Sequence, residues 1–159
     1  MITIEIRGGE GFKNVLLAKR DLLLNALRQK IDALDAMLQM KVQGKMEGDV
    51  VQSHTHHAAG SVRVIPAKIG GNVVRGSVEA GGGVAPYFRF IEEGTAPHLI
   101  RPVNKQALAF MIDGKQVFAK LVHHPGTKAT HLLRDSFDEL RDIAADELQK
   151  TVDEVISGT

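Results

Sequence analysis

An Asp-Gly pair, Asp113-Gly114, stands between two strand-like runs and constrains the fold more than any other short feature of this 159-residue chain. The first run is Ala107 to Ile112 and the second is Lys115 to Val122. A two-residue turn of type I′ needs positive φ at both central residues, and Asp-Gly is among the pairs that adopt it most readily. The sequence therefore predicts a β-hairpin with a fixed register, in which Ile112 faces Lys115.

The predicted register divides the hairpin into two faces, because side chains alternate along a strand. The face assigned to the core carries six apolar residues: Leu108, Phe110, Ile112, Val117, Ala119 and Leu121. The opposite face is mixed and carries Ala109, Met111, Gln116, Phe118, Lys120 and Val122. Met111 and Phe118 are large apolar groups on this mixed face. Either a helix of the same subunit covers them, or they are candidate residues of a contact between subunits.

Two long amphipathic segments bracket the β-rich middle of the chain. We expect helices over residues 11–43 and 131–157, since apolar residues recur there at steps of three, four or seven. The first stripe is Leu16, Leu23, Leu27, Ile31, Leu34, Leu38 and Val42, and the second is Leu133, Phe137, Leu140, Ala144, Leu148 and Val155. At 1.5 Å per residue the first helix would be on the order of 45 Å long, more than a small sheet can cover. Three leucines of its stripe are therefore further candidates for a subunit interface: Leu27, Leu34 and Leu38.

The second helix has an acidic outer face. This face is either solvated or an electrostatic surface toward a pore or a partner. Its residues are Asp135, Asp138, Asp142, Asp146 and Asp153.

A polar loop, residues 45–60, should follow the first helix, which we expect Gly44 and Gly48 to end. A β-rich core over residues 61–123 should come next, with a short helix at 86–93 inside it. Proline suits the first position of a helix and glycine the position just past its end. Pro86 and Gly94 therefore mark the two ends of this short helix.

These segments together predict an α+β fold. We expect a single domain, residues 1–159, in which an antiparallel sheet of about four or five strands is flanked by a long N-terminal helix and a long C-terminal helix.

Composition excludes several classes of protein. The chain has no cysteine, which excludes disulfides, thiolate metal ligands and cysteine nucleophiles. A net charge of +1 gives no sign of a strongly nucleic-acid-binding surface. No apolar run approaches the roughly 20 residues of a membrane helix, and residues 1–7 lack the regions of a signal peptide. We therefore expect a soluble protein that is not exported and has no membrane contact.

Histidines are the only side chains that suggest a chemical function. His54, His56 and His57 lie close together in the polar loop, and imidazoles bind zinc or nickel. However, no helix or strand is expected to hold these three side chains in place. Neither a Gly-x-Ser-x-Gly elbow nor a Walker or dinucleotide glycine pattern occurs. We predict no catalytic residue, no metal site and no cofactor, and therefore a protein that is not an enzyme.

Three local signals lie close together in the second half of the chain. They are the run YFRFIEEGT at 87–95, the run PHLIRP at 97–102, and the run HPGTKA at 124–129 followed by Leu132-Leu133-Arg134. This stretch, about a third of the chain, resembles the minor tail-component family of long-tailed bacteriophages. The positions that match the family's motif are Tyr87, Glu92, Gly94, Thr95, His98, Phe118, His124, Pro125 and Gly126. The chain departs from the family at His131, where such proteins often have proline, and at Asp135 and Ser136, where a Pro-Ala pair is frequent.

The resemblance implies a structural virion protein, a neck or tail-completion component at the head-tail junction. Proteins of this family resemble ring-forming components, commonly six-fold, so the expected partners are copies of the chain itself in a hexameric ring, head-tail connector proteins, and the tail tube and tail terminator proteins. DNA would pass without sequence-specific binding. The expected location is the virion, after synthesis in the cytoplasm of the bacterial host. The alternative is a phage-encoded accessory protein that binds a metal or contacts nucleic acid.

Overall fold

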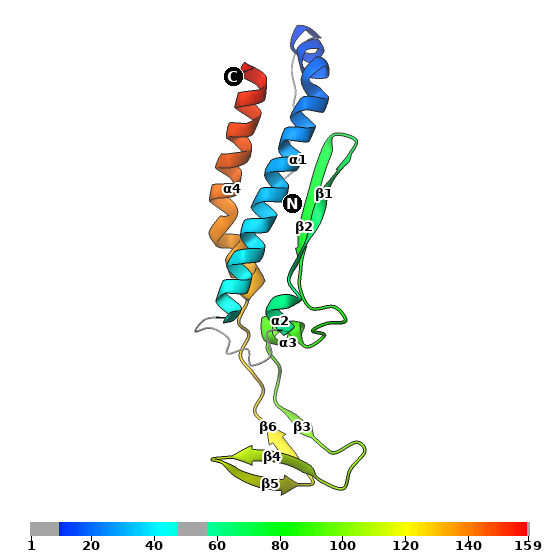
Figure 1. Ribbon diagram of the computed structural model, residues 1–159, viewed down its shortest axis with the longest axis vertical. Helices are drawn as coiled ribbons and strands as arrows, with labels where there is room; N and C mark the ends of the chain where they lie inside the picture. Colours follow the sequence, from blue (N-terminus) through cyan, green and yellow to red (C-terminus); the bar gives the residue numbers. More distant parts are fainter. Residues whose placement is uncertain (1–9, 48–56, 159) are drawn as a thin grey trace. The chain divides into compact units, whose positions relative to one another are not determined.

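The protein has an α+β fold with a long helix near each end of the described chain (Figure 1). The computed structural model describes residues 10–47 and 57–158, with the side chains of the first helix described from residue 19 onward. The helices of these residues are α1 (Glu10–Glu47), α2 (His57–Gly60), α3 (Phe88–Glu93) and α4 (Leu132–Ser157). Their strands are β1 (Arg63–Gly70), β2 (Val73–Glu79), β3 (His98–Ile100), β4 (Leu108–Ile112), β5 (Lys115–Ala119) and β6 (Val122–His124). The predicted fold class and the two long helices are thus confirmed.

The strands of the described residues form three separate two-stranded antiparallel sheets, β1–β2, β3–β6 and β4–β5. The prediction of one sheet of four or five strands was therefore wrong. Alternation and turn chemistry predict a strand and its hairpin neighbour, which is a local property of the chain. Whether one hairpin pairs with the next depends on contacts between distant segments, and these patterns do not encode such contacts.

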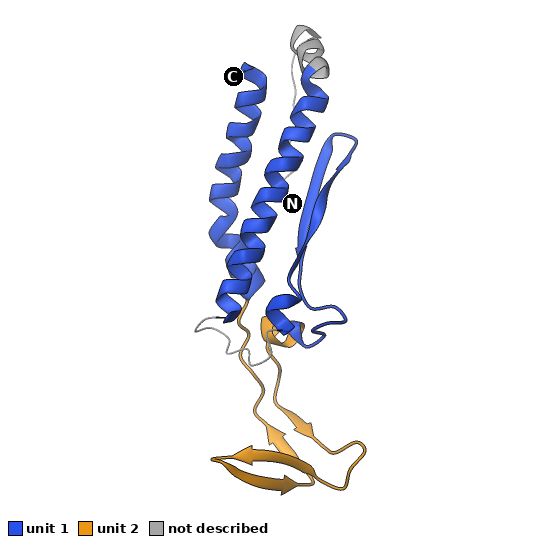
Figure 2. Cartoon of the chain, viewed as in Figure 1, with its two compact units in different colours: residues 1–88, 132–159 blue, residues 89–131 orange. Residues whose placement is uncertain are grey.

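The chain, which the sequence predicts to be a single domain, divides into two compact units (Figure 2). Unit 1 consists of residues 1–88 and 132–159, and its described part contains α1, α2, β1, β2 and α4. Unit 2 consists of residues 89–131 and contains the strands β3, β4, β5 and β6. Two of the three sheets therefore belong to unit 2.

Helices α1 and α4 pack side by side and antiparallel in unit 1 (Figure 1). Lys19, in the first half of α1, donates from Nζ to the carbonyl oxygen of Val155 at 3.2 Å, near the end of α4. Lys45, near the end of α1, pairs with Glu139 near the start of α4 at 2.8 Å. The core between the helices includes the buried side chains of Leu23, Leu27, Leu148 and Val152.

The predicted apolar stripe of α1 faces this core. Leu23, Leu27 and Val42 are buried, and Ile31, Leu34 and Leu38 are partly buried. The side chain of Leu16 lies outside the described ones. The stripe of α1 is thus confirmed over the part of the helix whose side chains are described.

The buried face of α4 agrees with the predicted stripe at five of its six positions: Leu140 and Leu148 are buried, and Leu133, Ala144 and Val155 are partly buried. Phe137, assigned to the inner stripe, is 48% exposed, whereas the polar Ser136 and Thr151 are buried. Phe137 is exposed because it lines an open groove of unit 1 and not because it lies on the outer face of the helix. The buried residues of α4 are Leu132, Ser136, Leu140, Leu148, Thr151 and Val152.

The β1–β2 hairpin lies along α1 and is held there at two points (Figure 1). Arg20 donates from Nη2 to the carbonyl oxygen of Gly71, in the turn of the hairpin, at 3.0 Å. Asp32 accepts a bond from the backbone N of Ala67 at 2.7 Å, where the register of β1 shifts. These two bonds fix both the end and the middle of the hairpin on α1.

The segment between α1 and β1 is more helical than predicted. Helix α1 runs through Gly44, so this glycine does not end it, and it includes residues 45–47 of the predicted 45–60 loop. Residues 57–60 form the helical turn α2. Gln43 of α1 donates to the carbonyl oxygen of Ala59 at 3.1 Å and so holds α2 against the helix.

The short helix of the middle region begins later than predicted. Helix α3 starts at Phe88 and not at residue 86. It ends before Gly94, whose φ of 72° is the left-handed conformation expected just past a helix end.

Candidate functional site

Most of the family-motif residues meet in unit 2, where residues 94–100 run antiparallel to residues 122–130. Thr95 and Thr127 form an isolated bridge in which each backbone N donates to the other carbonyl oxygen, at 2.9 and 3.1 Å. Their hydroxyl oxygens lie 3.1 Å apart. Strands β3 and β6 continue the pairing, with His98 opposite His124. These main-chain contacts join two segments that are about thirty residues apart in the sequence.

Two motif glycines permit the close approach of these segments. Gly94 and Gly126 have φ of 72° and 86°, a conformation that residues with a Cβ rarely adopt. A Cβ at Gly94 would lie 2.5 Å from the carbonyl oxygen of Thr127. A Cβ at Gly126 would lie 2.9 Å from the carbonyl carbon of Ala96 and still closer to the carbonyl oxygen of Thr95. Glycine is therefore required at both positions by backbone geometry.

The two motif histidines stack on each other, with ring centroids 4.9 Å apart and planes inclined by 28°. His98 donates from Nδ1 to the carbonyl oxygen of Ala96 at 2.9 Å. The Nδ1 of His124 accepts a bond from the backbone N of Gly126 at 3.1 Å, across Pro125. A ring nitrogen that accepts carries no proton, so this bond requires neutral His124 with its proton on Nε2. Both histidines thus shape the turns that they belong to.

Tyr87 and Phe118 do not join this cluster, since Tyr87 belongs to unit 1 and Phe118 lies in β5. Glu92 takes part through its backbone, because its carbonyl oxygen accepts a bond from the N of His131 at 3.1 Å. His131 has a φ of 50°, which the ring of proline cannot adopt. The departure from the family pattern at this position therefore has a physical meaning: proline could not replace His131 without changing the entry to α4.

The β4–β5 hairpin has the predicted register, with Ile112 opposite Lys115. Asp113 and Gly114 have φ of 48° and 75°, as a type I′ turn requires.

The two faces of this hairpin differ in exposure. Met111 and Phe118, on the mixed face, are 63% and 66% exposed, so the rest of unit 2 does not cover them. The opposite face is partly buried at Leu108, Phe110, Val117 and Ala119. Ile112 and Leu121 were also assigned to that face, yet both are exposed. Ile112 adjoins the turn and Leu121 follows the end of β5, where the hairpin has no further strand residues to pack beside them.

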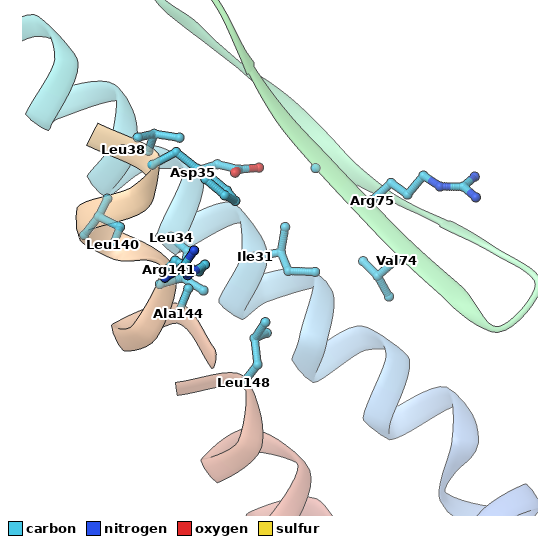
Figure 3. Close-up of a pocket in the computed structure, with 12 residues that line it drawn as sticks. Ile31, Leu34, Asp35, Leu38, Val74, Arg75, Leu140, Arg141, Ala144 and Leu148 are labelled. Carbon is cyan, nitrogen blue, oxygen red and sulfur yellow. The ribbon is translucent and has the colours of Figure 1, made fainter. Parts of the chain in front are cut away.

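A groove of about 350 Å³ opens in unit 1 between α1, α4 and β2 (Figure 3). Its apolar walls include Ile31, Leu34, Leu38, Leu140, Ala144 and Leu148. At one side β2 comes close to α1 because residue 76 is glycine. A Cβ there would lie 2.6 Å from Cγ2 of Ile31 and closer still to the carboxylate of Asp35.

Asp35 is the acidic residue of this groove. Its Oδ2 is buried and has no hydrogen-bond partner among the described residues. Burial and the neighbouring charge of Asp32 raise the pKa of the Asp35 carboxyl to about 6. Sequence patterns did not identify this residue, because an aspartate on a helix is ordinarily solvated and its burial here depends on β2.

The candidate interface leucines of α1 separate into two kinds. Leu27 is buried against the chain's own Leu148 and Val152, which leaves it no surface to offer to another subunit. Leu34 and Leu38 line the groove. The part of the interface prediction that named Leu27 is therefore not supported by its position.

Helix α4 carries two groups of carboxylates, one paired with lysines and the other on its exposed face. Glu139 accepts bonds from Lys41 and Lys45 of α1, which lower its pKa to about 2. The pKa of Glu147 is lowered in the same way, also to about 2, by bonds from Lys30 and Lys150. The predicted acidic face is exposed along the helix and consists of Asp135, Asp138, Asp142, Asp146 and Asp153.

Within residues 10–47 and 57–158, no group of three or more His, Asp or Glu side chains is placed to hold a metal ion. His57 begins α2, while His54 and His56, like Gly48, lie outside the described residues. In the same part of the chain, no helix combines the length and the apolar character needed to cross a membrane. Comparison of the chain with protein-family models, curated proteins and solved structures found no match.

Proposed function

We propose that the protein is a structural component of a tailed bacteriophage virion, a neck or tail-completion protein that forms a ring joining the tail tube to the head connector. The proposal starts from the likeness of residues 87–134 to minor tail components. Its partners would be further copies of the chain, the connector proteins, and the tail tube and tail terminator proteins.

The observation that carries the proposal is how the motif residues are used. Gly94 and Gly126 allow two backbones to approach, and Thr95 bonds to Thr127 across the gap. His98 and His124 direct their Nδ1 atoms to the backbone of their own turns. A motif that serves backbone geometry in this way defines a shape, which is what an assembly component requires.

The exposed face of the β4–β5 hairpin supports the same function. Met111 and Phe118 are large apolar side chains with most of their surface in contact with solvent. Contiguous exposed apolar groups are characteristic of protein-protein contacts. A component that is inserted between other virion proteins needs such a surface.

Deletion of the gene from the phage genome tests the proposal. We expect electron micrographs of the lysate to show DNA-filled heads and separate, complete tails, because the defect lies in joining. Wild-type protein supplied from a plasmid should restore infectious particles.

Three other outcomes would contradict this function. Normal infectious particles would show that the protein is dispensable for assembly. Empty heads would point to DNA packaging, and absent tails would point to polymerisation of the tail tube.

A further inference from the structure

The groove of unit 1 combines apolar walls with one unpaired acceptor (Figure 3). Phe137 lines it with 48% of its surface exposed, and Oδ2 of Asp35 lacks a hydrogen-bond partner among the described residues. An unpaired buried acceptor costs free energy, and so does apolar surface left in water. The group that would best fill the groove therefore has an apolar body and a nearby donor or positive charge.

The hairpin of unit 2 offers this combination. Phe118 is 66% exposed in β5, and Met111 in β4 lies on the same face. Lys120 is exposed and follows Phe118 by two residues, just past the end of β5. An aromatic side chain buries roughly 150–250 Å² when it is fully enclosed, so Phe118 has much to gain from a pocket.

The charges of the two units favour contact between unlike units. Residues 89–131, which form unit 2, contain six Lys or Arg and three Asp or Glu, a net charge of +3. The rest of the chain contains fourteen Lys or Arg and sixteen Asp or Glu, a net charge of −2. Helix α4, which forms one wall of the groove, has three basic and eight acidic residues. Two hairpin units would repel each other, whereas a hairpin unit and a groove unit attract.

Two arginines also line the groove, but neither neutralises Asp35. Arg141 pairs with Asp138 and Asp142, at 3.9 and 3.4 Å, on its own helix. Arg75 extends away from the helices (Figure 3). The charge of Asp35 therefore has no positive partner among the described residues.

We propose that the β4–β5 hairpin of one copy docks into the α1–α4–β2 groove of a second copy, with Phe118 between the apolar walls and Lys120 beside Asp35. This contact joins two different surfaces, so each copy offers one hairpin and one groove. Repetition of such a contact generates a ring if the rotation closes. The inference rests on the proposed ring in that it names the contact from which the ring would be built.

Cross-linking of purified protein tests the contact, and the absence of native cysteine makes each introduced thiol unique. Ala109 is exposed and lies opposite Phe118 in the hairpin, so Ala109→Cys places a thiol beside the anchor without removing it. Ala144→Cys places a thiol in the groove. The two single-cysteine variants, one of them with a tag that changes its mass, are mixed and treated with a mild oxidant. We expect a several-fold excess of the mixed disulfide-linked dimer over either self-linked dimer.

Two controls make the result specific. Leu22→Cys lies on α1, is 61% exposed and does not line the groove, so its yield with Ala109→Cys should stay at the background level. Adding Phe118→Glu to the Ala109→Cys variant should abolish the excess while the circular dichroism spectrum stays unchanged. Equal yields for the groove and control positions would overturn the proposal. So would an intramolecular disulfide in the Ala109→Cys, Ala144→Cys double variant, formed without any excess of mixed dimer.

The cross-linking test and the gene deletion can reject the contact and the function separately. If the deletion gives filled heads and separate tails but the cross-link does not form, the proposed function stands and this contact is rejected. If the cross-link forms but the deletion strain gives normal particles, the contact stands and the proposed function is rejected.

Discussion

Asp35 is a described residue whose surroundings are poorly suited to its charge. Its carboxyl has a pKa of about 6, chiefly because of burial and then because of the charge of Asp32. Arg75 of β2 and Arg141 of α4 line the same groove but do not bond to it. Because the folded-state pKa lies above the ordinary value of 3.8, the folded protein binds this proton more tightly than the unfolded chain does. Stability should therefore fall as the pH rises from about 4 to about 6.

Asp35→Asn should accordingly stabilise the protein at pH 7. A shift of this size would correspond to several kcal/mol in a dry interior, but the side chain is partly exposed, so we expect about 1 kcal/mol. The gain should vanish below about pH 4, where both states of the wild-type protein are protonated. Urea unfolding of dilute protein between pH 4 and pH 8 measures the difference.

Comparing the wild type with Asp35→Asn separates the contribution of Asp35 to the pH dependence of stability from the contributions of the other titrating groups. Glu139 and Glu147, with pKa values of about 2, stabilise the folded state above their ordinary pKa of 4.5, and this contribution is lost as the pH falls toward 2. That loss is common to the wild type and the variant. Asp21→Asn, at a side chain that is 88% exposed on the same helix, is the matched control and should change little. A gain at Asp35→Asn that does not depend on pH would contradict this account of the groove.

Gly126, like Gly94, is a glycine at which close approach and backbone conformation act together. Gly126→Ala should destabilise unit 2 by more than about 2 kcal/mol, since it adds a clash with Thr95 and Ala96 to the roughly 1–2 kcal/mol cost of a left-handed residue. Gly114→Ala has a similar φ, 75°, but open space around its Cβ, so it should cost only the conformational part. Hydrogen exchange at the backbone amides of Thr95 and Thr127 measures the effect. Equal loss of protection in the two variants would mean that the close approach is unimportant.

At the scale of elements, the β4–β5 hairpin separates residues that fold the chain from residues that remain available for contacts. Met111→Glu and Phe118→Glu should leave the circular dichroism spectrum and the melting temperature unchanged, because both side chains are already exposed. Phe110→Glu, on the partly buried face, should destabilise unit 2, with burial of such a side chain worth roughly 1.5–3 kcal/mol. Limited proteolysis within residues 89–131 distinguishes the two groups.

The two variants of the exposed face also test its role in the phage. In a complementation assay, Met111→Glu and Phe118→Glu protein should be present at normal levels and yet fail to join heads to tails. If both variants support normal particle yields, the mixed face has no part in assembly.

The elements show which parts of the fold are predictable from sequence. The register of β4–β5 follows from Asp113-Gly114 alone, because a two-residue turn fixes it without help from the rest of the chain. The buried face of α4 follows from its apolar residues only in part: Leu140 and Leu148 are buried as predicted, whereas Phe137 is exposed and Ser136 buried. Which face of a helix is buried depends on the shape of the partner, and the partner here is a helix about a hundred residues away in the sequence.

For the whole molecule, the candidate groove was beyond sequence reasoning for the same reason. It needs α1, α4 and β2 together, and it exists beside Asp35 only because Gly76 admits the carboxylate. The motif residues of unit 2 were identifiable, but from a resemblance and not from periodicity. Their physical role became clear only when Thr95 was found opposite Thr127. Helices, turns and register are local properties, whereas sheets and grooves are not.

The contact proposed between hairpin and groove makes a prediction about the size of the assembly. A contact between unlike surfaces can continue indefinitely as a filament or close as a ring, depending only on the rotation that it imposes. We expect light scattering of purified protein to show a molar mass that rises with concentration to a plateau and then stays constant, since a closed ring has no free surface to extend. Mass that keeps growing would indicate a filament, and a monomer at every concentration would contradict self-association in solution.

Salt should weaken this assembly without abolishing it. The attraction between a unit of charge +3 and one of −2 is screened as the Debye length falls from about 10 Å at 0.1 M salt to about 3 Å at 1 M. Burial of Phe118 and Met111, worth roughly 1.5–3 kcal/mol each, is not screened. The concentration needed to reach the plateau should therefore rise with salt, while the mass at the plateau stays the same. Lys120→Glu should reproduce the effect of high salt at 0.1 M, because it removes the cation placed beside Asp35. A plateau mass that changes with salt would mean that charges determine the geometry of the ring, and the apolar contact through Phe118 would then not be its main determinant.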